Sequence, residues 1–554
     1  MKELLARLMT RPVIFIELIA ASLFANLLAL ASSVYSIQVL NRYVSYGVDS
    51  TLATLTSGAL LAIILEFGFR QVRLSMAGAI SARPDSALAI GSFSILTGAK
   101  AAAMDMLPAG LRREVISGAD TVQAAYNAPN IAAVLDVPFA LVFVGALFLL
   151  SPAIAIVTIC FLVGVLALGV GSQIMLRKPT GELTAVSTRR STLVGSAIIA
   201  ADTVRAFNAA EFVRRSWRGE ASAYQELRGR VTNLQGLVQS LTQSAQAIMG
   251  VAVIAIGAVE VVAGDMTTGA MIGCNIMAAR ALSPVIRLAQ LAEAFVKARQ
   301  SLSMFKEFAR IPQERTQGSA LSAYKGGVAF IDVSFAYPGA KGPLFESLSM
   351  KLEPGSMLGV IGANGVGKTT LARLMLGLVE PTRGQVLVDG VDLAQVVPEW
   401  WRRQVSYLPQ EPRLLNVSIK DNLLAFNPDL DEAGINRLID ISGLRNFIDQ
   451  SQEGLDAAIV NNGDNLSLGI RRRLALARSL ACDGMLMVFD EPTEGLDKEG
   501  CAQVYALMKE QAGRGHTIIA FSNDPMILKG AGNTLDLNCK PAPLFTPATP
   551  KGKS

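Results

Sequence analysis

The residues best suited to chemistry lie in a glycine-rich segment in the second half of the chain. An apolar stretch starting at Met357 runs into the pattern Gly-x-x-x-x-Gly-Lys-Thr, which ends at Thr369 and is followed by a helical repeat of leucines. A phosphate-binding P-loop requires this order of strand, loop and helix. Its glycines let backbone N–H groups close around phosphate oxygens, and the helix N-terminus adds positive potential. We expect Lys368 to reach the β- and γ-phosphates of a nucleotide and Thr369 to hold Mg²⁺. The predicted nucleotide-binding residues of this segment are Gly362, Ala363, Asn364, Gly365, Val366, Gly367, Lys368, Thr369 and Thr370.

Two acidic residues end a second apolar strand further along the chain. The strand covers 485–489, and Asp490 and Glu491 follow it directly. Asp490 is placed to hold the shell of a Mg²⁺ ion, and Glu491 is placed to polarise an attacking water as a general base. Two solvated acids at a strand end are the plainer alternative, but the P-loop in the same region favours nucleotide chemistry.

The composition shows that these motifs belong to a membrane protein. The chain has 554 residues, of which 51% are hydrophobic and 17% charged, and its mean hydropathy is +0.40. Soluble domains carry about 25% charged residues, and a chain of this length holds at least two domains. The net charge of +5 is too small to indicate a nucleic-acid partner. The five cysteines show no CxxC spacing, so neither a disulfide framework nor a zinc site is expected.

Six apolar segments precede residue 300, and each approaches the roughly 20 residues that span a bilayer core. A soluble domain could not cover six such segments, so we expect contact with membrane lipid. The first is longer than the roughly 7–15 residues of a signal-peptide core and has no clear cleavage site, so we interpret it as an anchor. The predicted spans are about 13–36, 51–69, 131–150, 153–175, 238–263 and 267–288.

Basic residues predict the orientation of these spans. Lys2, Arg7 and Arg11 precede the first span, and many arginines occupy the two long connections, of about 60 residues each. The three short connections contain no lysine or arginine, although Arg42 lies just before the first of them. By the positive-inside rule, the N-terminus, the long loops and the C-terminal domain are all cytoplasmic. We expect much of each long loop to be helix that continues out of the membrane.

The predicted domain order follows from these composition changes. A transmembrane domain covers 1–310, a polar linker 311–326, and a soluble α/β domain 327–537. The last residues, 538–554, are rich in Pro, Thr and Lys and are expected to be a disordered tail.

A few polar residues lie inside the predicted spans and mark candidate pathway positions. Gln239, Gln243 and Gln246 share one face of the fifth span. They line a wetted lumen or form hydrogen bonds between helices, and the sequence does not favour either reading. Asn275 and Arg280 lie in the sixth span, and we expect Arg280 to pair with a carboxylate or to lie near the cytoplasmic end.

Further motifs in the soluble domain resemble those of the ABC transporter ATPase domain. They are Leu466-Ser-Leu-Gly-Ile470, the run Arg471–Arg478, and Asp490-Glu-Pro-Thr-Glu-Gly-Leu-Asp497. The resemblance covers about 327–537. It implies ATP and Mg²⁺ as ligands and a parallel sheet with a smaller antiparallel part near its start.

The resemblance also implies roles for single residues. Tyr337 looks like the aromatic residue that stacks on adenine. Gln410 looks like the glutamine that senses Mg²⁺ and the attacking water and faces the membrane domain. Ser467 and Gly469 look like the signature residues that contact the γ-phosphate of the partner subunit's nucleotide.

Six spans followed by one such domain resemble an exporter half-transporter, which works as a dimer. The fold class is therefore a membrane all-α six-helix exporter domain fused to an α/β P-loop ABC ATPase domain. The stretches Leu135-Asp-Val-Pro-Phe139 and Gly269–Pro284 narrow the resemblance to the ATPase subunit of type I secretion systems. That family exports unfolded proteins through a periplasmic adaptor and an outer-membrane channel. Some members carry a peptidase-like domain before the first span, and we expect none here because about twelve residues precede it.

Three departures from the ABC pattern lie around the expected position of the γ-phosphate. Leu468 and Ile470 replace the second glycine and the glutamine of the signature, and Val460-Asn461 replaces an upstream Gly-Glu pair. Asn523 stands where the family has a switch histidine, and the single histidine, His516, lies before the preceding strand. Loss of one preorganised donor costs about 10²–10³ in rate, although an asparagine amide can still donate. We therefore predict ATP binding with slow hydrolysis, with Glu491, Gln410 and Asn523 as the catalytic residues.

The leading functional prediction is ATP-driven export of an unfolded protein across the bacterial inner membrane. One alternative is half of a heterodimeric exporter of lipid, peptide or drug, whose partner supplies an intact signature. Another is a catalytically weak regulatory subunit that gates a complex through nucleotide occupancy.

Overall fold

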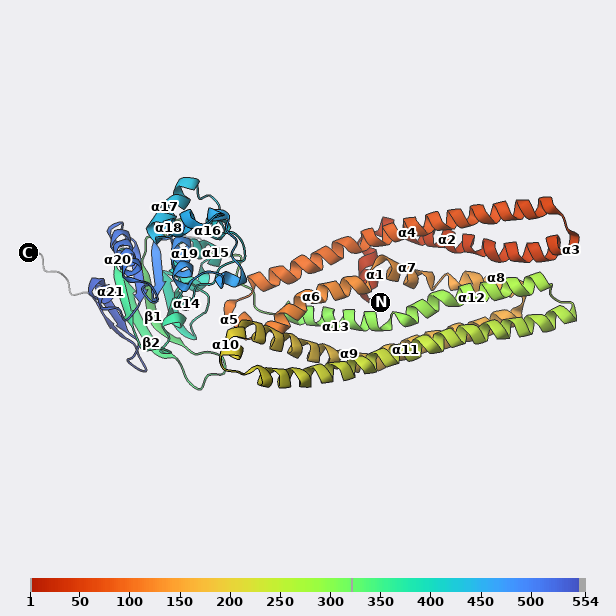
Figure 1. Cartoon of the computed structure of the whole chain (residues 1–554), viewed down its shortest axis with the longest axis horizontal. Coiled ribbons are helices and arrows are strands. Elements are labelled where there is room, and N and C mark those ends of the chain that lie inside the picture. The colour runs from red at the N-terminus through yellow and green to blue at the C-terminus, as the bar shows by residue number, and fades with distance from the viewer. Residues whose placement is uncertain (1, 320–321, 548–554) are drawn as a thin grey trace, which may run out of the picture. The chain divides into compact units, whose positions relative to one another are not determined.

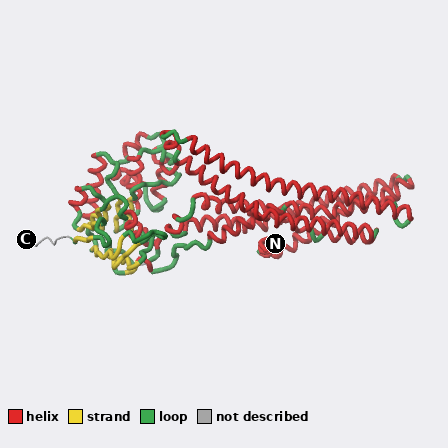
Figure 2. Tube along the Cα trace, turned by 90° about the horizontal axis from the view of Figure 1, so that it is seen from below, coloured by secondary structure: helices red, strands yellow, loops and turns green. Residues whose placement is uncertain are grey.

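The protein is described by a computed structural model that covers residues 2–319 and 322–547. The chain divides into two compact units. The first holds the residues up to Ala99 and Ala103–Ile311, and the second holds Lys100–Ala102 and the residues from Pro312 onward. Figure 2 shows that the first unit is built of helices and that the strands gather in the second.

The first unit consists of long helices that pack lengthwise. In Figure 1, α2 runs beside α4, and α9 runs beside α11. The helices are α1 (Lys2–Met9), α2 (Pro12–Gln38), η1 (Val39–Tyr43), α3 (Val44–Tyr46), α4 (Asp49–Gly98), α5 (Ala101–Asp105), α6 (Ala109–Ala125), α7 (Ala128–Asp136), α8 (Ala140–Leu150), α9 (Pro152–Ile199), α10 (Ala201–Ala206), α11 (Ala210–Ala263), α12 (Thr268–Gln290) and α13 (Ala292–Phe308).

Within the described residues, six helical segments are long and apolar enough to cross a membrane, which confirms the predicted six-helix membrane domain. They are Pro12–Tyr46, Asp49–Gly98, Ala128–Leu150, Pro152–Ile199, Ala210–Ala263 and Thr268–Phe308, and each overlaps one predicted span. Several are much longer than a bilayer needs: the 50 residues of α4 extend about 75 Å. The hydrocarbon core is about 30 Å thick, so helices of this length agree with the expected continuation of helix beyond the membrane.

Two of the three short connections between the spans lie at helix caps. α8 ends at Leu150, and Ser151 caps α9 by accepting a hydrogen bond from the backbone N–H of Ile154. α11 ends at Ala263, and the following residue, Gly264, has a φ of 84° that ends the helix. Thr267 then caps α12 through the backbone N–H of Ala270. Local cap chemistry therefore sets the ends of four spans.

Buried charge pairs join the helices of the first unit. Asp136 ends α7 and accepts hydrogen bonds from Arg73 of α4, at 2.5 Å, and from Asn26 of α2, at 3.0 Å. Asp136 belongs to the short motif 135–139, within which α7 ends and a turn at 137–139 precedes α8. The motif therefore ties three helices together at a break in the third span.

A second pair confirms the expectation for Arg280. Its guanidinium lies 3.7 Å from the carboxylate of Glu66 and donates to the hydroxyl of Ser32 at 3.0 Å. Glu66 also forms an ion pair with Arg70, with 2.5 Å between the charged atoms. Arg280 is thus partnered by a carboxylate from another span, as expected of an intramembrane charge.

The second unit contains a mostly parallel six-stranded sheet and a four-stranded antiparallel sheet, as predicted. Neighbouring strands run β10-β9-β3-β8-β7-β6 in the first sheet and β2-β1-β4-β5 in the second. In the part of the chain that the structure describes, β10 is the one strand of the larger sheet that runs antiparallel to its neighbour. The strands are β1 (Val328–Phe335), β2 (Phe345–Leu352), β3 (Met357–Ile361), β4 (Arg383–Val388), β5 (Val391–Asp392), β6 (Val405–Leu408), β7 (Leu486–Asp490), β8 (Thr517–Phe521), β9 (Asn533–Asp536) and β10 (Leu544–Thr546).

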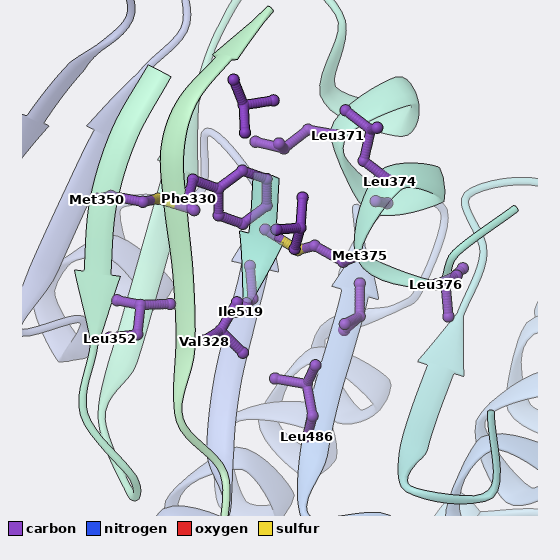
Figure 3. Packing of buried hydrophobic residues seen from close by; sticks show 14 of the residues in the cluster. Val328, Phe330, Met350, Leu352, Leu371, Leu374, Met375, Leu376, Leu486 and Ile519 are labelled. Atoms are coloured by element: carbon purple, nitrogen blue, oxygen red, sulfur yellow. The ribbon is translucent and has the colours of Figure 1, made fainter. Parts of the chain in front are cut away.

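Helices cover these sheets and leave the strand ends free for the site. They are α14 (Lys368–Met375), η2 (Leu393–Gln395), α15 (Pro398–Arg403), α16 (Ile419–Leu424), α17 (Glu432–Ser442), α18 (Arg445–Gln450), η3 (Gly454–Asp456), η4 (Asn461–Gly463), α19 (Leu468–Ala481), α20 (Lys498–Gly513) and α21 (Pro525–Gly530). Figure 3 shows the core between the antiparallel strands, α14 and the parallel sheet, where Phe330, Met375 and Ile519 are buried. This packing fixes α14, and with it the end of the P-loop.

Two predicted boundaries differ from the structure. The predicted tail begins at 538, yet Leu544–Thr546 form β10, which pairs with β9; residues 548–554 lie outside the described residues. The predicted linker ends at 326, yet Tyr324 is buried against Trp401 and Ser319 donates its backbone N–H to Gln395. Polar, proline-rich sequence suggested irregular chain in both places, but main-chain pairing and one aromatic contact hold these segments in the fold.

Candidate functional site

The P-loop connects β3 to α14 at the edge where the parallel strands end. β3 lies between β8 and β9, so the loop is flanked by the residues that follow both strands. Gly365 and Gly367 have φ values of 84° and 115°, a backbone conformation that glycine adopts without strain. A side chain at Gly367 would also meet Leu344 at 2.7 Å. The loop shape therefore depends on these two glycines.

The lysine and the second acidic residue of the predicted site are in contact. The side chain of Lys368 is 8% exposed, and its Nζ lies 2.6 Å from Glu491 Oε1. Lys368 also donates to the carbonyl of Gly362 at 3.0 Å. Residues 123 positions apart thus form one buried ion pair at the mouth of the loop.

The threonine and the first acidic residue are also brought together. Thr369 donates its hydroxyl to Asp490 Oδ2 at 2.9 Å, while Asp490 Oδ1 is buried and has no hydrogen-bond partner. Burial raises the pKa of Asp490 to about 6, with the nearby Glu491 adding to the rise and the Thr369 hydrogen bond opposing it. A buried carboxylate oxygen without a partner, beside a hydroxyl, suits a hard cation such as Mg²⁺.

Glu491 has an unusual backbone conformation. Its φ is 50°, which is uncommon for a residue with a side chain, and its backbone N–H donates to the carbonyl of Phe521 at 2.9 Å. This conformation turns the chain as β7 ends, so Asp490 and Glu491 face different partners. Local backbone strain of this kind is common at functional sites.

Gln410 lies in the same pocket as Glu491. It lines a pocket with Glu491 and Arg472, with about 380 Å³ of empty space that includes open solvent. Its amide donates to Glu494 at 3.3 Å, and Arg472 holds the same carboxylate oxygen at 3.3 Å. Glu494 was not among the predicted site residues, and no spacing rule pointed to its contact with Gln410.

Tyr337 precedes this site on the loop after β1. The side chain of Tyr337 is 42% exposed, its hydroxyl is 2.9 Å from that of Thr370, and its ring packs edge-on against Phe335 at 4.9 Å. Phe335 and Thr370 thus hold an exposed ring beside the P-loop, available to stack on a base.

Asn523 faces the start of the P-loop. Its Oδ1 accepts from the backbone N–H of Gly362 at 3.3 Å, and its Nδ2 donates to the carbonyl of Gly362 at 3.2 Å. His516 is buried elsewhere, with its Nδ1 3.0 Å from the carbonyl of Gly484. As the sequence indicated, this histidine lies apart from the P-loop contacts.

The signature residues lie at the start of another helix. Ser467 caps α19 by accepting from the backbone N–H of Ile470 at 3.3 Å, and Gly469 lies in its first turn. Within residues 2–319 and 322–547, no hydrogen bond or ion pair joins Ser467 or Gly469 to the P-loop. The side chain of Leu468 is 48% exposed at this helix start.

Two residues that the sequence assigned to the tail contact the P-loop. Asn538 Oδ1 accepts from the backbone N–H of Ala363 at 2.9 Å. Lys540 donates to the carbonyl of Val366 at 3.4 Å and also to that of Leu344. Their contacts depend on the β9–β10 hairpin, which the composition of this region did not indicate.

Comparison with known families identifies the class of protein that these two units form. Residues 15–284 match the family described as ABC transporter transmembrane region, and residues 345–494 match the ABC transporter family. The chain therefore belongs to the ABC transporters. It is an exporter half-transporter, with one membrane domain followed by one ATPase domain that couples ATP hydrolysis to transport.

Particular relatives narrow the relationship. The Toxin RTX-I translocation ATP-binding protein of Actinobacillus pleuropneumoniae is 27% identical over 519 residues, covering 94% of this chain and 73% of that protein. The exotoxin translocation ATP-binding protein PaxB of Pasteurella aerogenes is 27% identical over 511 residues, covering 92% of this chain and 72% of that protein. A solved structure of a bacterial Atm1-family ABC exporter with ATP bound shares the fold, with a TM-score of 0.83 and 20% identity over 95% of this chain and 93% of that chain. The chain is thus distantly related to RTX toxin translocation ATP-binding proteins.

Proposed function

We propose that this protein exports an unfolded protein across the bacterial inner membrane, as the ATPase of a type I secretion system. The observation that carries the proposal is the fusion of six spans to the Lys368–Glu491 site in one chain. The names of its relatives, toxin translocation ATP-binding proteins at 27% identity, support a protein as cargo. In this proposal the chain is a multi-pass inner-membrane protein with a cytoplasmic ATPase domain, and it works with a periplasmic adaptor and an outer-membrane channel.

In this proposal, some residues of the site bind the nucleotide and Mg²⁺, and Glu491 takes part in the hydrolysis step. Backbone N–H groups of the P-loop and Lys368 hold the phosphates, and the exposed ring of Tyr337 stacks on adenine. Thr369, Asp490 and Gln410 are the residues that would hold Mg²⁺, which supplies positive charge to the phosphate oxygens when it is bound. Glu491 accepts a proton from the attacking water once phosphate oxygens replace it as the partner of Lys368.

Slow hydrolysis is part of the proposal. The amide of Asn523 is occupied on both sides by Gly362, so it presents less donor capacity to a γ-phosphate than a histidine ring in that position. Leu468 places an exposed apolar side chain where the usual signature has glycine. The residues that bind nucleotide keep their pattern, which favours binding over turnover.

The same departures support a second candidate, half of a heterodimeric exporter of lipid, peptide or drug. A partner with an intact signature would complete the P-loop site of this chain, while the degenerate signature here would serve the partner's nucleotide poorly. A nucleotide-gated regulatory subunit is the third candidate, since binding without fast turnover suffices for gating. The three candidate functions differ in which chain is the partner and in whether transport requires Glu491.

The three glutamines of α11 are proposed to face the pathway. Gln239, Gln243 and Gln246 are exposed within the protomer, and none of their side chains has a hydrogen-bond partner in the described part of the chain. The exposed apolar residues Leu237 and Leu241 lie on a different arc of the same helix. Lipid suits the leucine arc, whereas amides without partners need water, substrate or a partner helix.

A cysteine pair tests this assignment. In a cysteine-free background, Gln243→Cys is expected to react with a membrane-impermeant thiol reagent at least about tenfold faster than the matched Leu241→Cys. Equal protection of both positions, with and without nucleotide, would argue against a wetted arc.

Reconstituted transport tests the proposed function itself. Purified protein in vesicles, supplied with adaptor and an unfolded cargo protein, is expected to lose both nucleotide binding and export on Lys368→Ala. Glu491→Gln is expected to keep nucleotide binding and lose export, because only the proton acceptor is removed. If export persists in Glu491→Gln, the regulatory candidate is favoured, and if it persists in Lys368→Ala, the proposal fails.

A further inference from the structure

The P-loop is held from both sides by residues that follow the strands flanking β3. Asn523 follows β8 and makes two hydrogen bonds to Gly362, at 3.3 and 3.2 Å. Asn538 follows β9 and accepts from the backbone N–H of Ala363 at 2.9 Å. Two successive peptide units at the start of the loop are therefore bonded to two asparagines from opposite neighbours in the sheet.

Asn538 is itself held in position. Both its backbone N–H and its side-chain Nδ2 donate to Asp536 Oδ1, at 2.8 and 2.9 Å. The backbone before it is bonded to β3, because Leu537 donates to the carbonyl of Ile361 at 2.9 Å. The acceptor oxygen of Asn538 is thus aimed at the loop by contacts that do not involve the loop itself.

Lys540 extends this contact along the loop. Its ammonium group donates to the carbonyl of Val366, at 3.4 Å, and to that of Leu344. The following residue, Pro541, accepts from the backbone N–H of Glu346 at 2.8 Å, which ties the segment to β2. A segment after the last parallel strand thus contacts both the second and the fifth residue of the P-loop.

From these contacts we infer that Asn523, Asn538 and Lys540 form a clamp that fixes the P-loop in its phosphate-binding shape. The clamp residues are positioning residues, because they act on the backbone of the loop. Asn523 then has a different task from the switch histidine whose place it takes, since both polar atoms of its amide hold Gly362. The inference rests on nucleotide binding at this loop.

The clamp predicts a distinct effect on nucleotide affinity. A loop that is fixed in advance loses less conformational entropy when phosphate binds. The β-phosphate is common to ADP and ATP, so loss of a clamp residue weakens both nucleotides by the same factor. A residue that touches the γ-phosphate affects ATP and leaves ADP unchanged.

The test compares ADP and ATP binding by titration calorimetry on the full-length protein in detergent. Asn523→Ala, Asn538→Ala and Lys540→Ala are each made with and without Glu491→Gln, which prevents turnover during the ATP measurement. Each is expected to raise the Kd for ADP and for ATP by the same factor, about two- to tenfold for the loss of one or two hydrogen bonds. Lys509→Ala, at an exposed position of α20, is the matched control and leaves both constants unchanged.

Two outcomes would overturn the clamp. An unchanged Kd for ADP in all three variants would show that the loop keeps its shape without these residues. An increase confined to ATP in Asn523→Ala would make Asn523 a γ-phosphate contact. Because Asn538 and Lys540 are exposed, their variants are expected to fold. If Lys368→Ala abolishes binding while the clamp variants behave like Lys509→Ala, the clamp is wrong and the proposed function stands.

Discussion

At the scale of single residues, we expect Asn523 to limit how fast this ATPase hydrolyses ATP. In the wild-type protein, the Asn523 amide is hydrogen-bonded to Gly362. Asn523→His puts an imidazole ring in its place, and the N–H donor of that ring extends further from the backbone. A restored transition-state donor is expected to raise kcat at saturating ATP by about tenfold or more. The same change removes the two hydrogen bonds to Gly362, so the Kd for ADP is expected to rise. Phosphate release by the purified protein, measured across ATP concentrations, gives kcat, and titration calorimetry gives the Kd for ADP.

The unchanged protein supplies the reference for this prediction. Its kcat is expected to lie at least about tenfold below that of an exporter with an intact signature and switch histidine, assayed in the same detergent. A fast wild-type enzyme that gains nothing from Asn523→His would contradict the assignment of Asn523 as the weak point.

The sequence supplies candidate residues for the site, whereas it does not predict the contacts between them. The P-loop and the Asp490–Glu491 pair follow fixed spacings, because phosphate binding requires glycine geometry and acids at a strand end. The contacts of Asn538 and Lys540 arise from where the β9–β10 hairpin lies relative to β3. That placement is a property of the sheet order, and no periodicity in a proline-rich segment encodes it.

At the level of the helices, the buried pair between Asp136 and Arg73 joins α7 to α4. Asp136→Ala leaves the Arg73 guanidinium, with a side chain 9% exposed, without its carboxylate. Breaking a buried pair by removing one partner typically costs about 3–5 kcal/mol. We expect a clear fall in the thermal unfolding midpoint of the detergent-solubilised protein, followed by tryptophan fluorescence.

Matched variants separate this effect from a general loss of charge. Arg189→Ala removes one side of an exposed pair with Glu220 and is expected to change the midpoint little. The double variant Asp136→Leu with Arg73→Met removes both charges and is expected to recover most of the loss. An Asp136→Ala protein as stable as wild type would show that the motif 135–139 does not join the helices through this pair.

Helix positions were predictable from apolar length, whereas helix partners were not. All six spans could be placed because a bilayer demands about 20 apolar residues in each. The pairs Arg73–Asp136 and Arg280–Glu66 depend on which helices are neighbours, and residues 63 or 214 positions apart carry no local signal of contact. Arg280 was expected to find a carboxylate because an unpaired charge in lipid is costly, but only the fold identifies Glu66.

For the whole molecule, the half-transporter architecture requires a second ABC half. If the two halves are identical, we expect a different pattern of ATP turnover than if they are different chains. The signature residues Ser467 and Gly469 make no hydrogen bond or ion pair with the P-loop in the described chain, as expected if they serve a partner's nucleotide. A homodimer would contain two degenerate sites, whereas a heterodimer would contain one degenerate and one improved site. We therefore expect slow ATP turnover at both sites of a homodimer. In a heterodimer, we expect the two sites to turn over ATP at different rates.

Co-purification distinguishes the two assemblies. We expect tagged and untagged copies of this chain, expressed together, to purify as a mixed dimer in the presence of ATP and Mg²⁺. The dimer is expected to be most stable in Glu491→Gln, where bound ATP persists and continues to hold the two ATPase domains together. Lys368→Ala serves as the control, since it should lose any nucleotide-dependent part of this association. Native mass spectrometry reports the composition directly: a second copy of this 58.7 kDa chain supports the homodimer. Recovery of a different ABC chain in its place would reject the homodimer and favour the heterodimeric exporter.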